Sequence, residues 1–198
     1  MFDAPVLFLV NSVYQLFTAL HLKNSILKEE KADILLTDVT EKLREYQERI
    51  KDTGIFQRVL FARTKDLNRK YAVGKQEEIS EGFDQRESIF RWILSDELGE
   101  YREIYFSNFD TFTRMLASRY YESSCSFICY EDGFSTYVID FLKEGRAPVN
   151  SHPQGKLLGE KLQKVLLYEP RLAMRGDRFP NYPLPKVKFG YSRLLELL

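Results

Sequence analysis

Residues 6–17, VLFLVNSVYQLF, decide the fold that this sequence encodes. The first five residues form an unbroken apolar run, as in a strand that is covered on both faces within a parallel sheet. Asn11 and Ser12 interrupt the run, and the apolar residues that follow recur at helical spacing. Ser12 with Gln15 three positions later has the form of a helix capping box. The sequence therefore predicts a strand that passes into a helix through a very tight turn.

The same alternation of a strand-like run and a helical stretch recurs along the chain. Further strands are predicted at residues 33–37, 58–61, 103–106 and 126–130, and further helices at 40–51, 87–98, 112–120 and 134–142. Alternating units of this kind close a parallel sheet. We therefore predict an α/β fold with a Rossmann-like parallel sheet and helices on both faces. Residues 6–10 and 126–130 should be interior strands, because both runs are almost entirely apolar.

Two regions depart from this pattern. Residues 62–85 are charged and only weakly periodic, and they predict either a mobile excursion near a binding face or a solvated loop with a short helix. After Gly145 prolines loosen the pattern, although a helix near 156–164 and a short strand at 165–168 remain. We place a Rossmann-like domain at residues 1–168 and a connector toward a second domain at 169–198. Residues 191–198 would begin a further helix.

Composition narrows the classes of function. The chain has 198 residues, enough for one domain, and its 29 Lys and Arg balance 29 Asp and Glu. Without net charge, nothing draws the chain to nucleic acid, and its longest apolar run is too short for a transmembrane segment. We expect a cytoplasmic protein and no nucleic-acid partner. Peripheral association with the inner face of the membrane, and a homodimer, remain open.

Metal, disulfide and phosphate-cradle sites have little support. Cys125 and Cys129 fall on one predicted strand, roughly 13 Å apart at ~3.3 Å per residue, which exceeds the reach of a disulfide. With two His and no Cys-x-x-Cys, the sequence does not predict a structural zinc site. The first strand is followed by Asn-Ser-Val-Tyr rather than by a glycine-rich loop, which argues against a phosphate-handling α/β enzyme.

Ligands of parallel sheets bind outside the carboxyl ends of the strands. In this sequence polar residues follow the predicted strands at these ends. The acid pair Glu131 and Asp132 follows the fifth strand. In one interpretation Asp132 caps the helix that begins near Phe134. In the other, a carboxylate at this edge accepts a proton from a substrate hydroxyl as a general base.

Three segments carry a resemblance to a known family. Residues 130–137, YEDGFSTY, resemble the acidic-acidic-Gly motif of bacterial sialyltransferases, including the lipooligosaccharide sialyltransferases of glycosyltransferase family 52 and the polysialyltransferases. Residues 9–16, LVNSVYQL, are similar to the strand-turn-helix with a Tyr-Gln or Pro-Gln step that begins such enzymes. LYEP at 167–170 and YPLP at 182–185 resemble the segment before their second domain.

The resemblance implies the N-terminal, acceptor-side domain of an inverting GT-B glycosyltransferase, acting in capsule or lipooligosaccharide synthesis. It would use a CMP-sugar, with CMP-sialic acid as the first candidate, as co-substrate and no other cofactor or metal. Its acceptor would be a glycan or glycolipid. Asp132 matches the second acidic position, which is the general base of the family, and Glu131 would assist it. The candidate substrate-binding residues are Asn11, Ser12, Tyr14, Gln15, Ser107, Asn108, Gly133 and Ser135.

The sequence departs from the family at its His-Pro motif, which contacts the donor phosphate and lies in the second domain. His152-Pro153 follows the acidic motif by only about twenty residues, in the region we interpret as loosely structured, so we expect His152 to be a loop residue without that role. His21 is expected to be structural. The nucleotide sugar would then bind to a C-terminal domain missing from this chain. The alternative is a stand-alone α/β binding or interaction module without catalytic activity.

This assignment of the two halves predicts that the isolated chain binds CMP-sugars weakly or not at all and transfers no sugar by itself. Titration calorimetry with CMP-sialic acid and with CMP measures the affinity. Tight binding of either nucleotide to this chain would show that the donor and acceptor halves are assigned the wrong way round.

Overall fold

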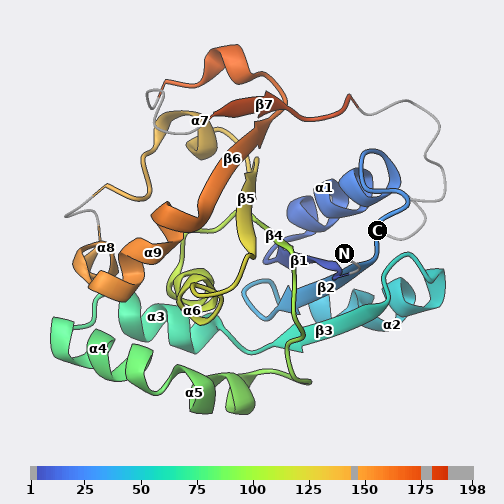
Figure 1. Ribbon diagram of the computed structural model, residues 1–198. Helices are drawn as coiled ribbons and strands as arrows, with labels where there is room; N and C mark the ends of the chain where they lie inside the picture. Colours follow the sequence, from blue (N-terminus) through green and yellow to red (C-terminus); the bar gives the residue numbers. More distant parts are fainter. Residues whose placement is uncertain (1–3, 144–146, 175–179, 187–198) are drawn as a thin grey trace.

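The computed structural model describes residues 4–143, 147–174 and 180–186, so the helix predicted at 191–198 lies outside the described residues. The strands form one sheet in the order β3-β2-β1-β4-β5-β6-β7, and all neighbouring strands are parallel (Figure 1). This confirms the predicted α/β, Rossmann-like class. The strands are β1 (Val6–Val10), β2 (Ala32–Thr37), β3 (Arg58–Ala62), β4 (Glu103–Phe106), β5 (Ser126–Tyr130), β6 (Leu162–Leu167) and β7 (Asn181–Pro183).

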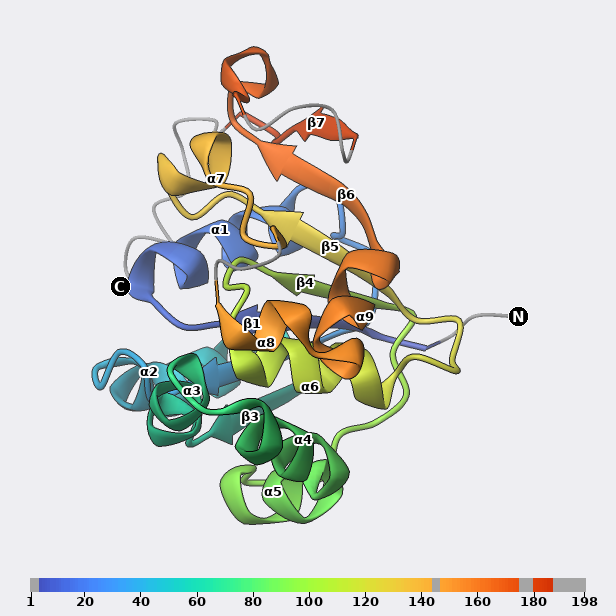
Figure 2. The same cartoon turned by 90° about the vertical axis from the view of Figure 1, so that its left-hand side faces the viewer.

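Helices cover both faces of the sheet (Figures 1 and 2). On one face, the core contains residues of α1 (Val13–Asn24) and α2 (Leu43–Thr53). The core of the other face takes its residues from α3 (Lys65–Ala72), α4 (Gln76–Asp84), α5 (Arg86–Ile93), α6 (Thr111–Arg119) and α9 (Pro153–Lys161). Three single-turn elements complete the described chain: α7 (Ser135–Val138), α8 (Pro148–Ser151) and the 3-10 helix Pro170–Leu172.

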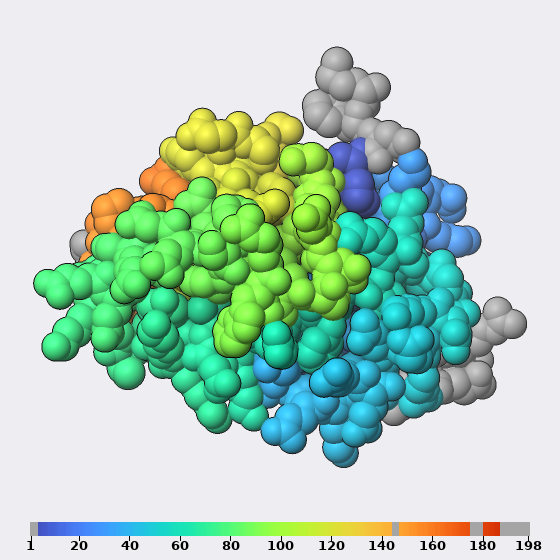
Figure 3. Space-filling view, turned by 90° about the horizontal axis from the view of Figure 1, so that it is seen from below, coloured from blue at the N-terminus to red at the C-terminus, as the bar shows by residue number. Residues whose placement is uncertain are grey.

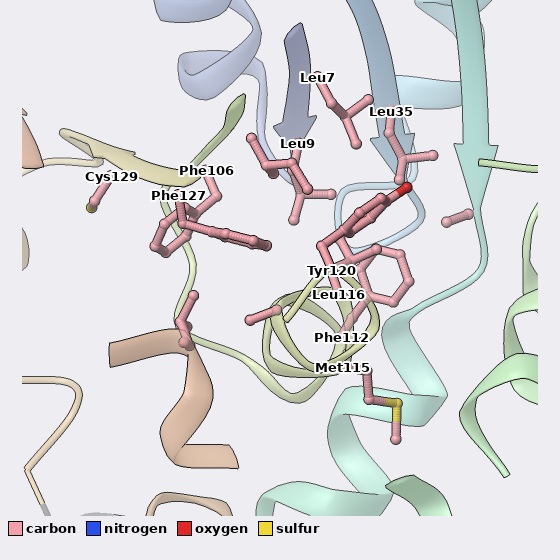
Figure 4. Close-up of a cluster of buried hydrophobic side chains, with 14 of the residues drawn as sticks. Leu7, Leu9, Leu35, Phe106, Phe112, Met115, Leu116, Tyr120, Phe127 and Cys129 are labelled. Atoms are coloured by element: carbon pink, nitrogen blue, oxygen red, sulfur yellow. The ribbon is translucent and has the colours of Figure 1, made fainter. Parts of the chain in front are cut away.

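The strands β1 and β5 are interior, as their apolar runs predict. No residue of β1 is more than 1% exposed, and the apolar residues of β5 are fully buried. Because side chains alternate between the faces of a strand, Leu7 and Leu9 belong to the core under α6, and Phe8 to the core under α1 and α2. Figure 4 shows Leu9 above the α6 residues Leu116 and Phe112. Polar residues at these positions would lack hydrogen-bonding partners.

The strand order creates a topological switch point between β1 and β4. From β1 the chain adds β2 and β3 to one side, and from β4 it adds β5, β6 and β7 to the other. Residues of the helix after β1 lie in one core and residues of the helix after β4 in the opposite core. The connections therefore leave the sheet in opposite directions, and ligands of open α/β sheets bind at such a point.

The region 62–85 differs from its prediction. It forms two short helices, α3 and α4, which bury Leu67, Tyr71, Ile79 and Phe83 rather than a mobile loop. The close packing requires a glycine, since a Cβ on Gly82 would lie 2.6 Å from the ring of Tyr71. The remaining positions are mostly charged and exposed, and therefore obscure the apolar stripe in the sequence. Figure 3 shows the outer surface of this region, coloured green.

Three predicted elements end elsewhere. The helix expected over 134–142 is only the single turn α7, and α5 ends at Ile93, beyond which Leu94 pairs with Ala62 of β3 in an isolated bridge. Within the segment 169–198, expected to be a connector, β7 pairs with β6. The sheet thus continues past residue 168, so the predicted boundary does not mark its end.

A buried arginine holds the layer around α6 together. Arg114 is 1% exposed, and its guanidinium donates hydrogen bonds to the carbonyls of Phe109 at 3.3 Å, Gly155 at 2.8 Å and Phe141 at 3.1 Å. These carbonyls belong to the loop before α6, to α9 and to the segment after α7. Burial lowers the pKa of Arg114 to about 10, although the nearby carboxylate of Asp110 opposes this shift. One side chain therefore joins three segments that are distant in sequence.

We predict that Arg114→Met destabilises the fold, because it removes the charged donor that three carbonyls share and the positive charge that acts on Asp110. The free energy of unfolding, measured in urea, should fall by about 2 kcal/mol, as for hydrogen bonds to charged groups. Arg69→Met, at an exposed position of α3, is the matched control and should change stability little. Equal stability of the two variants would contradict the joining role of Arg114.

Candidate functional site

A hydrogen-bonded cluster at the carboxyl ends of β1, β4 and β5 centres on Gln15, in the first turn of α1. The Gln15 Oε1 atom accepts from the backbone N–H of Asn11 at 2.7 Å. Its Nε2 donates to Asp132 Oδ2 at 2.8 Å and also to Asn108 Oδ1. Gln15 is 1% exposed. The carboxamide therefore uses its acceptor and both amide hydrogens within the chain.

Asn11 is fixed from β2 and from the loop after it. Thr37 donates its hydroxyl to Asn11 Oδ1 at 2.7 Å, and Thr40 donates to the Asn11 carbonyl at 2.8 Å. The Ser12 hydroxyl caps α1 by accepting from the N–H of Gln15, as predicted. The second half of the predicted capping box is displaced by one residue, because the Gln15 side chain accepts from Asn11 rather than from Ser12. In this arrangement the Gln15 amide nitrogen faces the residues that follow β4 and β5.

Asp110 is a structural acid at the end of β4 that the sequence analysis did not select. It caps α6, since its Oδ1 accepts from the N–H of Thr113 at 2.9 Å. Its Oδ2 accepts from Asn68 at 2.9 Å and from Asn11 at 3.4 Å. Burial raises the pKa of Asp110, while the bonds from Thr113 lower it. An Asp directly before a helical stretch is a capping signal that the sequence alone supplies. The contact with Asn68 of α3 could not be predicted from the sequence.

Asp132 lies half-buried at the end of β5, beside Gln15. Its backbone N–H donates to the Thr136 hydroxyl at 3.1 Å, while the hydrogen bond recorded for its carboxylate comes from Gln15. Phe134, not Asp132, is the N-cap of α7, and α7 has no side-chain cap. The helix-cap interpretation is therefore wrong for Asp132. Burial raises the pKa of its carboxyl group, and the bond from Gln15 opposes the rise by favouring the charged form.

Glu131 turns away from this cluster and is buried. Its Oε2 accepts from the hydroxyl of Tyr137 and from the backbone N–H of Tyr168 at 2.8 Å. The Tyr137 hydroxyl in turn accepts from the N–H of Glu169 at 3.1 Å, and the Tyr137 carbonyl accepts from Met174 at 2.8 Å. Burial raises the pKa of Tyr137 to about 12, with the hydrogen bond to Glu131 adding to the effect. Glu131 thus anchors the chain after β6.

The other predicted site residues divide between the interior and the surface. Ser107 is buried and donates its hydroxyl to the carbonyl of Tyr130 at 2.8 Å, which ties β4 to β5. Gly133 has φ of 91°, a conformation that favours glycine, and it turns the chain between Asp132 and α7. Tyr14 is 43% exposed, and Phe134, which was not among the predicted site residues, is 77% exposed. Ser12, Asn108 and Ser135 lie at intermediate depth.

The two histidines are held by the fold. His152 lies between α8 and α9, is 8% exposed and stacks on Phe83 at 4.8 Å, so it is not a loop residue open to solvent. Its Nε2 is 3.0 Å from the hydroxyl of Ser80, and burial lowers its pKa. His21 Nε2 is 2.8 Å from the carbonyl of Pro185. Replacing His152 would therefore cost stability, whereas its expected lack of a donor-binding role stays a prediction.

Neither a metal-binding cluster nor a membrane-spanning helix occurs among the described residues. No group of three or more His, Cys, Asp or Glu within residues 4–143, 147–174 and 180–186 is arranged to hold a metal ion. In the same part of the chain, no helix combines the length and apolar character needed to cross a membrane. Comparison with models of protein families gives no match, and comparison with curated proteins gives no significant one. The function has to be argued from the site itself.

The bond between Glu131 and Tyr137 predicts a measurable contribution to stability. Tyr137→Phe removes the hydroxyl that donates to a buried carboxylate, and it should lower the free energy of unfolding by about 2 kcal/mol, as for hydrogen bonds to charged groups. Tyr121→Phe is the matched control, because the Tyr121 hydroxyl donates to Glu160 at the surface. Urea unfolding of the two variants measures the difference. A Tyr137→Phe protein as stable as the control would refute the anchoring role of Glu131.

Proposed function

We propose that this chain is the acceptor-side domain of an inverting glycosyltransferase, with a CMP-sugar as donor and Asp132 as the general base. The observation that carries the proposal is the state of Asp132: a half-buried carboxylate at the carboxyl edge of a parallel sheet, oriented by one buried donor. A base of this kind takes the proton from an acceptor hydroxyl as that oxygen attacks the sugar carbon and the nucleotide leaves. The resemblance of residues 130–137 to the sialyltransferase motif supports the same residue.

Partial burial suits the carboxylate to this task. A general base is most effective when its pKa lies near the working pH, and burial moves the pKa of Asp132 upward from the ordinary value of 3.8. Glu131 is less suited, because it is 7% exposed and its Oε2 already accepts two hydrogen bonds. Of the two adjacent acids, only Asp132 leaves room at its carboxylate for an acceptor hydroxyl.

Aromatic side chains near Asp132 support a sugar as acceptor. Tyr14 lies close enough to Asp132 and Glu131 for both carboxylates to raise its pKa, an effect that adds to a larger one from burial. Phe134, two residues after Asp132, leaves 77% of its surface exposed. Binding sites for small molecules commonly combine aromatic faces with a few polar groups that fix the orientation of the ligand. Tyr14 and Phe134 offer such faces to the apolar side of a sugar ring.

The rival is a binding module in which the same edge holds a ligand without chemistry. The position of the cluster at the topological switch point favours it equally, since fold and location do not distinguish binding from catalysis. The two functions differ in what they require of Asp132. A binding site needs a hydrogen-bond acceptor, which Asn also supplies, whereas a general base needs basicity.

Asp132→Asn is therefore expected to lower turnover at least 100-fold, the lower range for loss of a general base. The assay measures sugar transfer from CMP-sialic acid to a glycan acceptor, and it uses the full-length protein with all of its domains. The melting temperature and acceptor affinity should change little, because Asn can still accept from Gln15. Glu131→Gln should cost less turnover, and the surface variant Asp52→Asn is the matched control.

Near-parental turnover of the Asp132→Asn protein would reject Asp132 as the base. Loss of activity caused by unfolding would show as a lowered melting temperature and would likewise remove this support. Absence of transfer by the parent protein, together with glycan binding that survives Asp132→Asn, would favour the binding module.

A further inference from the structure

We propose that Gln15 is the positioning residue of this site: its side chain contacts no substrate, but it aligns the Asp132 carboxylate and stabilises the negative charge on it. The catalytic consequence rests on the proposed function, whereas the alignment itself rests on the hydrogen bonds of the described residues. The sequence predicted substrate binding for Gln15, and the geometry points to a different role.

The orientation of the Gln15 amide is determined by its partners. The backbone N–H of Asn11 can only donate, so the atom that faces it at 2.7 Å must be the carbonyl oxygen Oε1. The nitrogen then faces Asp132 Oδ2 and Asn108 Oδ1. A flipped amide would place its oxygen against both of these acceptors and its nitrogen against the N–H of Asn11. Three partners on three segments therefore agree on one orientation.

No donor of Gln15 remains for a substrate. One Nε2 hydrogen is used by Asp132 and the other by Asn108, and only 1% of the residue is exposed. The support for this arrangement also lies within the fold, since Asn11 is fixed by Thr37 and Thr40. A rigid donor of this kind holds a carboxylate in one rotamer, and such preorganisation by supporting residues determines how well a site works.

The charge on Asp132 is subject to two opposing influences. Burial disfavours the ionised form, and the hydrogen bond from Gln15 favours it. The titratable groups that interact with Asp132 are Tyr14 from α1 and Tyr130 of β5, and Glu131 is its neighbour in the chain. None of these three groups carries a positive charge, and the group that favours the Asp132 anion is the neutral amide of Gln15.

The test replaces Gln15 by Met, which has a similar length and no amide. Without the donor the ionised form of Asp132 loses stability, so its pKa rises and the protonated form persists to higher pH. We expect the carbon-13 titration of the Asp132 side chain, assigned by its absence in Asp132→Asn, to shift upward by about one pH unit, as for loss of one charge-assisted bond. Gln47→Met on α2, whose amide donates to the Val59 carbonyl, is the matched control and should leave the titration unchanged.

An unchanged titration of Asp132 in folded Gln15→Met protein would overturn the inference. If that variant does not fold, the side-chain amide protons of Gln15 are followed by NMR in the parent protein, where one of them donates to Asp132. Its resonance should shift with the titration of Asp132, and an amide resonance that does not follow this titration would overturn the inference as well.

Turnover separates this inference from the proposed function. Turnover should decline as pH falls through the pKa of Asp132, and in Gln15→Met this acid limb should move to higher pH with the titration, while KM for the acceptor stays nearly unchanged. A titration that moves without the acid limb would reject Asp132 as the base but leave the role of Gln15 intact. If the titration of Asp132 is unchanged in Gln15→Met while Asp132→Asn strongly lowers turnover, the role of Gln15 is rejected and Asp132 remains the base.

Discussion

The fold places three strand ends next to one another at the point where its strand order reverses, and the carboxamide of Gln15 satisfies polar groups from all three. The backbone of Asn11 after β1, Asn108 after β4 and Asp132 after β5 meet on this one side chain. Buried polar groups without partners are costly. The orientation of the half-buried Asp132 carboxylate depends on this interaction, because its donor belongs to the helix after β1, on the other side of the switch point.

Elements whose signal is local could be predicted from the sequence. Continuous apolar runs identified β1 and β5 as interior strands, and the Ser12 cap identified the start of α1. The location of the polar cluster followed from a general property of parallel sheets. By contrast, the helices α3 and α4 were missed. Their apolar residues are few and widely spaced, and the packing of Tyr71 against Gly82 cannot be inferred from either residue alone.

The candidate site was predicted as a set of residues but not as a set of roles. Sequence separates Gln15 from Asp132 by more than a hundred positions, and Asn68 from Asp110 by more than forty, so the partners are known only once the fold is known. In the structure the side chains of Gln15, Ser107 and Glu131 each bond to other groups of the chain, contacts that their positions in the sequence do not reveal. The role of Asp110 as a helix cap, in contrast, depends only on the nearby residue Thr113 and can be predicted from residues 110–113.

The adjacent acids Glu131 and Asp132 differ in what their side chains contribute to the fold. Side chains of successive residues at the end of a strand point to opposite sides, and Glu131 stabilises the chain after β6 through its bonds to Tyr137 and Tyr168. The Asp132 side chain accepts one bond, from Gln15. Burial raises its pKa, which means that ionisation is less favourable in the folded protein than in water. An Asn at this position would accept the same bond from Gln15 without that penalty. A sequence that keeps the carboxylate keeps a feature that folding alone disfavours, and such conflicts between local stability and residue choice are characteristic of functional sites.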